Sequence, residues 1–329
     1  MNSILASDSN QINMDTVNFD NTKLSQLINF KFGDPINICL EVNPPRGVDF
    51  TSVLKRLKGN VAGISFINVT DSALARMRCS PFAFASILKQ ELGIEPLVNV
   101  SCRDRNVIAL QGDLLGGSIL GIKSVIALTG DAISVGDMPN AKGVFEINSV
   151  GLLDIISKLN NGFDLVGNTL KGKTDYIAGV VVNPNAKNIS AELRRLEKKR
   201  LAGARYALSQ PVFDLESARE FLTQANREVR IPILLGLMPL RSGDAGLGLK
   251  NIPGMKVPQD MIDECIRTGN NDFSEYSINR AIKTAEELVD LVGGFHVISG
   301  PTPLLGLKLA HILVDKFKGY KSNLSLADL

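Results

Sequence analysis

The sequence predicts an α/β fold, a single (β/α)8 barrel of the TIM type that forms one catalytic domain. Eight short runs rich in β-branched residues alternate with segments of helical periodicity. Each run is apolar throughout rather than alternating, as expected for parallel strands that are covered on their faces. Eight such units in most of a 329-residue chain fit a barrel.

The first four expected strands are each followed by a helical segment. They are 36–43 (INICLEVN), 63–69 (GISFINV), 96–102 (PLVNVSC) and 124–130 (SVIALTG). The last four are 176–183 (YIAGVVVN), 205–213 (RYALSQPVF), 231–238 (IPILLGLM) and 295–300 (FHVISG). Helical patterns between them include DFTSVLKRLKG, FAFASILKQELG, VIALQGDLLGGSILGI and AELRRLEKKRLAG, and several end in glycine, as helix C-termini often do.

A doubly wound open sheet is the alternative fold. It would show about six strands and a glycine-rich first turn, and no GxGxxG follows the first strand here. The glycines in LLGGSILG (Gly116, Gly117 and Gly121) lie inside a helical pattern, where close packing explains them better than phosphate binding. The barrel is therefore preferred.

The chain divides into an N-terminal extension over 1–32, flexible or partner-binding, the barrel over 33–320, and a tail over 321–329. The step between the fourth and fifth strands is unusually long, because the polar, Gly- and Pro-punctuated segment 131–175 separates them. We expect this segment to form a long loop above the barrel that serves binding.

Composition indicates a protein that acts on small molecules. Net charge is +2, Trp is absent and aromatic residues make up only 5%, which argues against nucleic-acid or membrane partners. The four cysteines lack paired spacing and the two histidines lack a metal-binding motif, so we expect no disulfides and no metal. The N-terminus does not resemble a signal peptide and no apolar run could span a bilayer, so we expect a cytoplasmic location.

Polar residues gather where the expected strands end, which is where barrel enzymes carry their chemistry. They are Glu41, Asn43, Asn68, Thr70, Asp71, Asn99, Ser101, Arg103, Asp104, Thr129, Asp131, Asn183, Gln210 and Arg241. The set lacks the Ser/His/Asp or Cys/His groups of acyl transfer and a strand-end Lys for Schiff-base chemistry. It suits a polyfunctional heterocycle such as a pterin or a flavin.

Glu41 stands out because it lies in an otherwise apolar strand. A carboxylate tipped into solvent is the simpler interpretation, but burial would raise its pKa and make it a general acid. Asp131 could accept two N–H groups from an aminopyrimidine edge, and Gln210 could both donate and accept. The basic run RRLEKKR (194–200) is either a solvated face or places Lys198 or Lys199 near a ligand phosphate.

The chain resembles the methylenetetrahydrofolate reductase family over roughly residues 36–315. The segments that carry the resemblance are LEVNPPRG (40–47), CRDRNVIALQGDLLGGSILGIKSVIALTGD (102–131), VGDMPNAKGVFEINSVGLL (135–153), RRLEKKRLAGARYALSQPVFD (194–214), GLMPL (236–240) and IPGMKVP (252–258). It is most similar to the barrel that some bacteria fuse to a homocysteine methyltransferase.

The resemblance implies a flavin-dependent reduction of 5,10-methylenetetrahydrofolate to 5-methyltetrahydrofolate. Glu41 would be the general acid, and Asp131 would hold the pterin and act beside the flavin. Gln210 and Asn43 would contact the substrate. The family positions near flavin or nicotinamide correspond to Asn68, Thr70, Asn99, Thr129, Gly130, Asp131, Asn148, Asn183, Lys198 and Lys199. The flavin would be FAD, with FMN as the less favoured choice.

Several positions depart from the family pattern. Its flavin-binding His is Asn99 here and the Arg of its RGD motif is Thr129, while VISGPTPLLG (297–306) lacks its strand-eight Arg and GDAGLGLKN its substrate-stacking Phe. The reductant is therefore either NADH or NADPH, or electrons come from a partner electron-transfer subunit. A homo-oligomer is the other assembly expected. A pterin-binding methyltransferase barrel without redox chemistry and a non-catalytic binding module are the rival functions.

Overall fold

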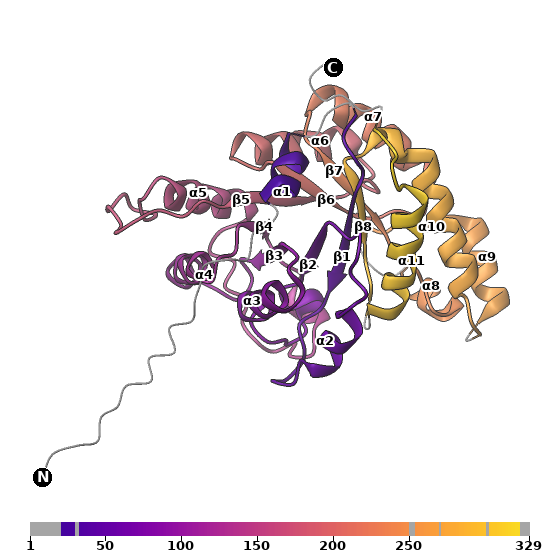
Figure 1. Ribbon diagram of the computed structural model, residues 1–329, viewed down its shortest axis with the longest axis horizontal. Helices are drawn as coiled ribbons and strands as arrows, with labels where there is room; N and C mark the ends of the chain where they lie inside the picture. Colours follow the sequence, from indigo (N-terminus) through magenta and orange to yellow (C-terminus); the bar gives the residue numbers. More distant parts are fainter. Residues whose placement is uncertain (1–20, 30–32, 250–253, 270, 301–302, 323–329) are drawn as a thin grey trace, which may run out of the picture.

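A computed structural model describes residues 21–29, 33–249, 254–269, 271–300 and 303–322 of the chain. Eight parallel strands close into one barrel in the order of the sequence, and helices surround it (Figure 1). The strands are β1 (Asn37–Val42), β2 (Phe66–Val69), β3 (Pro96–Ser101), β4 (Ser124–Leu128), β5 (Ile177–Val182), β6 (Tyr206–Pro211), β7 (Ile233–Leu237) and β8 (Gly294–Val297). The predicted (β/α)8 fold is confirmed, and each expected strand is present.

The helices follow the strands in the expected alternation. They are α1 (Asn21–Ile28), α2 (Thr51–Leu57), α3 (Pro81–Leu92), α4 (Val107–Ile119), α5 (Ser149–Asn160), α6 (Ile189–Leu201), α7 (Leu215–Glu228), α8 (Gly243–Leu249), α9 (Gln259–Thr268), α10 (Ser274–Leu288) and α11 (Pro303–Lys316). Short 3-10 turns are η1 (Ala73–Ala75), η2 (Ile133–Val135) and η3 (Val289–Leu291). In the described part of the chain, no helix is both long and apolar enough to cross a membrane.

Local signals in the sequence explain where the outer helices begin and end. Asn106, Asn148, Asn188 and Asp214 each precede a helix and accept a hydrogen bond from a backbone N–H of its first turn. Helix α3 starts at Pro81 and is followed by Gly93 in the left-handed conformation (φ 67°). These caps satisfy backbone groups that a helix cannot satisfy internally.

Side-chain alternation along the strands separates two cores. One set of strand residues packs outward against the helices, and the other fills the barrel interior. The interior core consists of Cys39, Phe66, Leu97, Ile126, Tyr206, Leu208 and Leu234, joined by two residues of α1, Leu24 and Leu27. Both leucines are buried, so α1 lies at the amino-terminal end of the strands and closes that mouth. Of the extension expected over 1–32, residues 1–20 and 30–32 lie outside the described residues.

The prediction of one long binding loop over 131–175 is wrong for its second half. Residues 149–160 form α5, which is the regular barrel helix of this unit. The following segment folds back through a bridge between Phe163 and Thr169 and leads into β5 at the opposite end of the barrel. Apolar residues of α5 are buried against the outer core, so tertiary packing makes a helix of this segment. Only the part up to Asn148 follows the carboxyl end of β4.

The glycines of α4 serve packing and the turn that ends the helix. A Cβ on Gly117 would lie 2.3 Å from the Phe82 ring and 2.7 Å from the Tyr176 hydroxyl, so close packing is confirmed there. Gly121 has φ 76° just after the helix, a conformation that favours glycine. Gly116 has open space around it, so nothing in the structure requires glycine at that position.

Candidate active site

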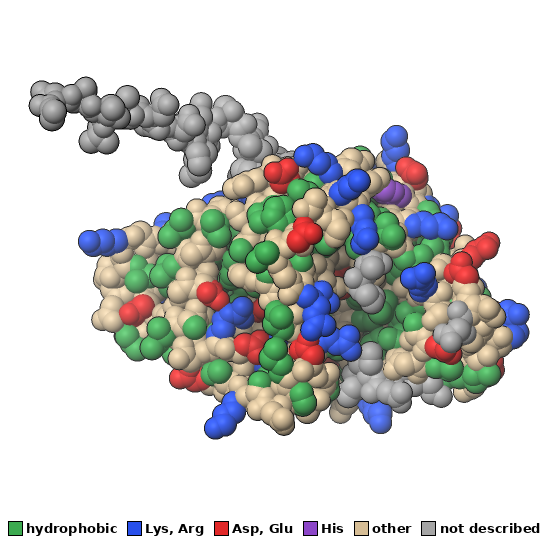
Figure 2. Space-filling model, turned by 90° about the horizontal axis from the view of Figure 1, so that it is seen from below, with side chains coloured by type: hydrophobic (Ala, Val, Ile, Leu, Met, Phe, Trp, Pro, Cys, Tyr) green, Lys and Arg blue, Asp and Glu red, His purple; other side chains and the backbone are tan. Residues whose placement is uncertain are grey.

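The carboxyl-terminal mouth of the barrel is more polar than the opposite mouth, where the buried polar residues Asn37 and Ser124 have hydrogen-bond partners. On β1 to β3 the inward positions change from Cys39, Phe66 and Leu97 to Glu41, Asn68 and Asn99. Glu41 and Asn68 are paired in register on neighbouring strands. Figure 2 looks at the molecule from below Figure 1, where α2 and α8 lie, and shows a hollow in this face bordered by Lys and Arg side chains.

Glu41 lies near the end of β1 and is mostly shielded from water, with its side chain 16% exposed. Burial raises the pKa of its carboxyl group to about 7, because the charged form loses hydration. The simpler interpretation, a carboxylate tipped into solvent, is therefore wrong. At neutral pH a large fraction of this group carries a proton and can donate it.

His296 faces Glu41 from β8, with 3.8 Å between its Nε2 atom and Oε2 of Glu41. Burial lowers the pKa of His296 to about 4, so the imidazole is neutral near pH 7. Neither ring nitrogen makes a hydrogen bond to the described residues. The two groups thus form a carboxyl group of raised pKa beside a neutral imidazole, rather than an ion pair. Sequence reasoning missed His296; its signal was a histidine at an inward position of an apolar strand.

Two amide side chains form a second polar group under the mouth. Asn68 Nδ2 donates to the Leu97 carbonyl (2.9 Å) and to Asn99 Oδ1 (2.7 Å). The Oδ1 atom of Asn68 is buried and has no partner among the described residues. A buried acceptor of this kind is costly unless a donor reaches it. The position of Asn68 is therefore one where a ligand N–H group would be stabilised.

Asn43 and Thr70 tie the ends of three strands together. The Thr70 hydroxyl donates to Asn43 Oδ1 (2.8 Å), and Asn43 Nδ2 donates to the carbonyl of Gly300 (2.9 Å). Thr70 is buried, whereas Asn43 is half-buried. The hydrogen bonds of both side chains hold the loops around Glu41 in place.

Asp131 is exposed at the mouth beside the β4 end. One carboxylate oxygen accepts the backbone N–H of Leu74 (2.7 Å), and the other makes no hydrogen bond to the described residues. Gly130 before it has φ 99°, and a Cβ there would lie 2.3 Å from the Ser101 hydroxyl, so only glycine fits this turn. Thr129 is exposed and accepts the N–H of Ser149 (3.3 Å).

Gln210 is exposed at the end of β6, where the register with β7 shifts. Gly236 on β7 allows this approach, because a Cβ there would lie 2.6–2.7 Å from the carbonyls of Ser209 and Gln210. The Ser209 hydroxyl accepts the N–H of Gly236 (2.7 Å) and secures the irregular pairing. The Gln210 amide is thereby presented at the mouth.

The remaining predicted cofactor residues lie farther out on β5, α5 and α6. Asn183 donates to the carbonyl of Gly254 (3.0 Å), and Asn148 caps α5 through Val150 N–H (2.9 Å). Lys199 donates to the carbonyl of Val181 (2.6 Å) and is partly buried, which lowers its pKa. Lys198 is exposed.

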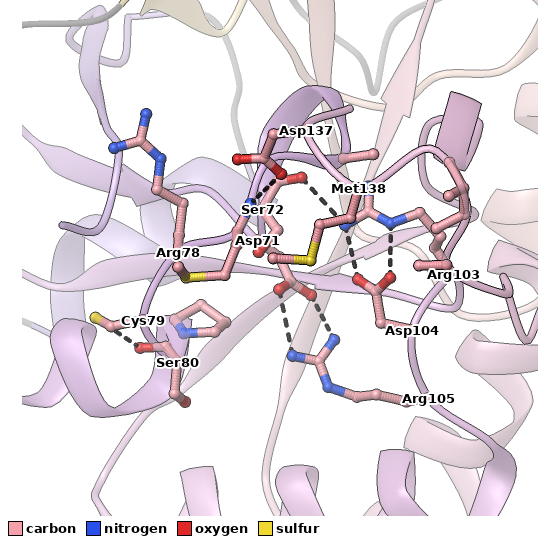
Figure 3. Close-up of a pocket in the computed structure, with 15 residues that line it drawn as sticks. Asp71, Ser72, Arg78, Cys79, Ser80, Arg103, Asp104, Arg105, Asp137 and Met138 are labelled. Atoms are coloured by element: carbon pink, nitrogen blue, oxygen red, sulfur yellow. Dashed lines mark hydrogen bonds and ion pairs between the residues drawn. The ribbon is translucent and has the colours of Figure 1, made fainter. Parts of the chain in front are cut away.

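A cavity of about 340 Å³ lies beside the mouth, between the loops that follow β2, β3 and β4 (Figure 3). Its wall contains a network of ion pairs: Arg103 with Asp104 (2.7 Å) and Arg105 with Asp71 (2.7 Å). Asp71 also accepts the N–H of Ser101 (2.8 Å), so these strand-end charges brace the loops. The sequence placed Asp71, Arg103 and Asp104 at the mouth but did not indicate this pairing.

Comparison with known proteins adds a family match. The model of the family described as methylenetetrahydrofolate reductase matches residues 23–299. A probable methylenetetrahydrofolate reductase (NADPH) of Caenorhabditis elegans is 25% identical over 265 residues, which is 76% of this chain and 38% of that protein. The 5,10-methylenetetrahydrofolate reductase of Salmonella typhimurium is 25% identical over 277 residues (75% of this chain, 87% of the relative). That of Escherichia coli is 23% identical over 274 residues, with the same coverage.

Among solved structures, an uncharacterized protein from Clostridium thermocellum that binds two copies of 5-methyl-5,6,7,8-tetrahydrofolic acid shares the fold. The TM-score is 0.68 at 15% identity, over 89% of this chain and 99% of that chain.

Proposed function

The chain belongs to the methylenetetrahydrofolate reductase family, and on that premise we propose that it reduces 5,10-methylenetetrahydrofolate to 5-methyltetrahydrofolate, with Glu41 as general acid. The family model covers residues 23–299, and bacterial relatives matched over 87% of their length carry the name of this enzyme. The resemblance and the enzyme class predicted from the sequence are thus confirmed. The catalytic roles of individual residues and the cofactor are proposals.

The observation that carries the proposal is the buried Glu41 carboxyl, whose pKa lies at about 7. The substrate holds its one-carbon unit as a methylene bridge between N5 and N10. Glu41 donates its proton to N10 as the bond between N10 and the methylene carbon breaks, and N10 keeps the electron pair. The methylene remains on N5 as an iminium, which accepts a hydride to become the methyl group. Because Glu41 is 16% exposed, solvent can return its proton.

Asp131 and Gln210 are suited to orient the pterin. A pterin presents two neighbouring N–H donors, its 2-amino group and N3–H, and the carboxylate of Asp131 has an oxygen without a hydrogen bond to described residues. Gln210 is exposed across the mouth and can both donate and accept. These contacts would hold N10 over Glu41 and contribute through positioning.

The residues at the mouth fit a flavin by their chemistry. The buried Oδ1 of Asn68, which has no hydrogen-bond partner among the described residues, suits a ring N–H donor. Asn68, Thr70, Asn99, Thr129 and Gly130 would line the ring, with Asn148, Asn183 and Lys198 farther out toward the phosphates. Lys199 would act indirectly, since its ammonium already donates to Val181. When bound, a reduced flavin, FAD in our proposal, supplies the hydride.

Electrons would reach the flavin from NADH or NADPH, or from a partner electron-transfer subunit. The rival of another class is a pterin-binding methyltransferase barrel without redox chemistry. We favour the reductase because relatives matched over most of their length carry the name of this enzyme and because Glu41 can supply the proton that opening the methylene bridge requires.

An anaerobic absorbance titration of the purified protein tests the proposal. We expect a flavin spectrum, present as purified or after reconstitution with FAD, that bleaches with NADH or NADPH and returns on addition of methylenetetrahydrofolate. Bleaching by dithionite alone, with reoxidation by the folate intact, would assign the electron supply to a partner. A protein that binds folate but cannot be reconstituted with flavin would overturn the reductase in favour of the methyltransferase.

A further inference from the structure

One arginine, Arg78, lines two cavities at once. It contributes to the 340 Å³ cavity beside the mouth and to a smaller one of about 60 Å³ that reaches Glu41. We call the smaller one the rim cavity. Its wall includes Glu41 and Asn43 at one end, Arg56 and Arg78 from the loops and helix of the first two units, and Ser299 after β8.

Arg78 has no carboxylate partner among the described residues, in contrast to three nearby arginines. Arg103, Arg105 and Arg46 each pair with an aspartate. Within the described residues, Arg78 donates to the carbonyl of Pro44, at 3.3 Å, and to no other group. In Figure 3 its guanidinium extends away from the Asp71–Arg105 and Arg103–Asp104 pairs, and no dashed line reaches it.

The surroundings of Arg78 are unfavourable for a lone cation. Partial burial and the nearby Arg46 and Arg76 lower its pKa, and Asp137 offsets this only in part. Arg56, the other cation of the rim cavity, is exposed on the last turn of α2 and has no ion pair within the described residues. The cavity therefore carries positive charge that an anion would compensate.

The rim cavity contains a further unsatisfied group. Ser299 is buried, and its hydroxyl makes no hydrogen bond to the described residues. The segment 297–306 contains neither Lys nor Arg, so the β8 side of the mouth offers no cation of its own there. Positive charge next to Glu41 thus comes from the side of β1 and β2.

We propose that Arg78, assisted by Arg56, binds the glutamate carboxylates of the folate substrate in the rim cavity. The inference rests on the proposed function, which places N10 of the folate at Glu41. Beyond N10 the folate continues through its p-aminobenzoyl group to a glutamate with two carboxylates. The rim cavity is lined by Glu41 and by Arg78, whose guanidinium has no carboxylate partner in the described residues. Its lining therefore offers an acid for N10 and a cation for the glutamate. The planar guanidinium of Arg78 can bind a carboxylate through two parallel hydrogen bonds.

Binding of two ligands that differ only in the tail tests the proposal. The probes are 5-methyltetrahydrofolate and 5-methyltetrahydropteroate in the form of its uncharged amide (below, the pteroate), which lacks the glutamate and carries no carboxylate. Both are titrated into wild type, Arg78→Ala, Arg78→Lys and Arg56→Ala by calorimetry. We expect Arg78→Ala to weaken methyltetrahydrofolate about 10- to 100-fold, as for loss of a charged hydrogen-bonding pair. The pteroate should bind all variants equally. The affinity of Arg78→Lys for methyltetrahydrofolate should lie between those of wild type and Arg78→Ala. Arg56→Ala should have a smaller effect because that residue is exposed.

Arg76→Ala is the matched control, since Arg76 is an exposed arginine of the same loop that lines neither cavity. It should bind both ligands as wild type does. Equal losses for folate and pteroate in Arg78→Ala would mean a structural role and overturn the tail subsite, as would unchanged binding of both. Wild type that binds neither compound would instead overturn the proposed function, and the tail subsite with it.

Discussion

The two mouths of the barrel are built from the same strands but in opposite ways. At the amino-terminal mouth the inward residues are mostly apolar, the buried Asn37 and Ser124 have hydrogen-bond partners, and Leu24 and Leu27 of α1 cover this end. At the carboxyl-terminal mouth the next inward positions are Glu41, Asn68 and His296, and Asn68 and His296 have polar atoms without a partner in the described part of the chain. The first arrangement contributes stability through burial, whereas the second holds groups in costly states that a ligand can satisfy. Changes at the two mouths should therefore separate stability from activity.

The largest expected effect is the loss of the acid at the polar mouth. Glu41→Gln keeps the size and hydrogen bonding of the side chain but removes its proton-donating group. We expect the rate of folate reduction to fall at least about 100-fold, while reduction of the flavin by its donor is spared. Stopped-flow measurement of each half-reaction checks this. Glu91→Gln, an exposed glutamate on α3 paired with Lys58, is the control and should leave both rates unchanged.

Removing apolar contacts at the sealed mouth should have the reverse outcome. Leu27→Ala leaves a cavity against the interior core, and we expect the free energy of unfolding to fall by about 2–5 kcal/mol. Turnover per folded molecule should not change. Urea unfolding followed by circular dichroism, together with an activity assay, measures both. Gln26→Ala on the exposed side of α1 should affect neither, and a Leu27→Ala variant of normal stability with impaired turnover would contradict the division between mouths.

The burial of Glu41 should also make stability depend on pH. Its folded-state pKa of about 7 exceeds the ordinary value of 4.5, so the folded state holds the proton more tightly. The contribution of protonated Glu41 to the free energy of unfolding is fully present below pH 4.5. It is lost as the pH rises through 7, a change of about 3 kcal/mol. The free energy of unfolding of Glu41→Gln minus that of wild type should therefore increase as the pH rises from 4.5 to 8.

Unfolding of both apoproteins by urea across this range measures the difference. His296, whose pKa is lowered to about 4, destabilises the fold as the pH falls from 6.5 toward 4. This contribution falls below pH 6.5, so the change between pH 6.5 and 8 reports on Glu41. A difference that does not vary with pH would mean that Glu41 titrates normally.

The smallest expected effect concerns Asn148, which lies on the loop from the polar mouth yet caps α5. Asn148→Ala should lower the free energy of unfolding by about 1 kcal/mol, and Asn148→Asp should restore it. Asn188→Ala at the start of α6 should cost a similar amount. Thermal unfolding of the apoproteins measures the contribution of each cap to the free energy of unfolding. If Asn148 also binds the flavin, Asn148→Ala alone should weaken flavin affinity, and equal affinities in the two variants would limit Asn148 to its role as a cap.

The sequence by itself determined the barrel and the place of its chemistry. Short β-branched runs alternating with helices permit few other packings, and strand ends in such a fold share one face, which is why Glu41, Asn68 and Asn99 could be grouped without coordinates. Local capping signals such as Asn106 and Gly93 also define helix ends directly. These features depend on neighbours in the chain or on a regular period of side chains.

What only the tertiary structure decided depends on contacts between distant segments. His296 faces Glu41 because β8 closes against β1, which no local pattern encodes. Segment 149–160 is a helix because its apolar side finds the outer core, and Lys199 is held by a carbonyl of β5 rather than left for a ligand. The protonation state of Glu41 likewise follows from its burial by residues far apart in the sequence. Such states follow from desolvation and pairing, which exist only once the chain has closed into a barrel.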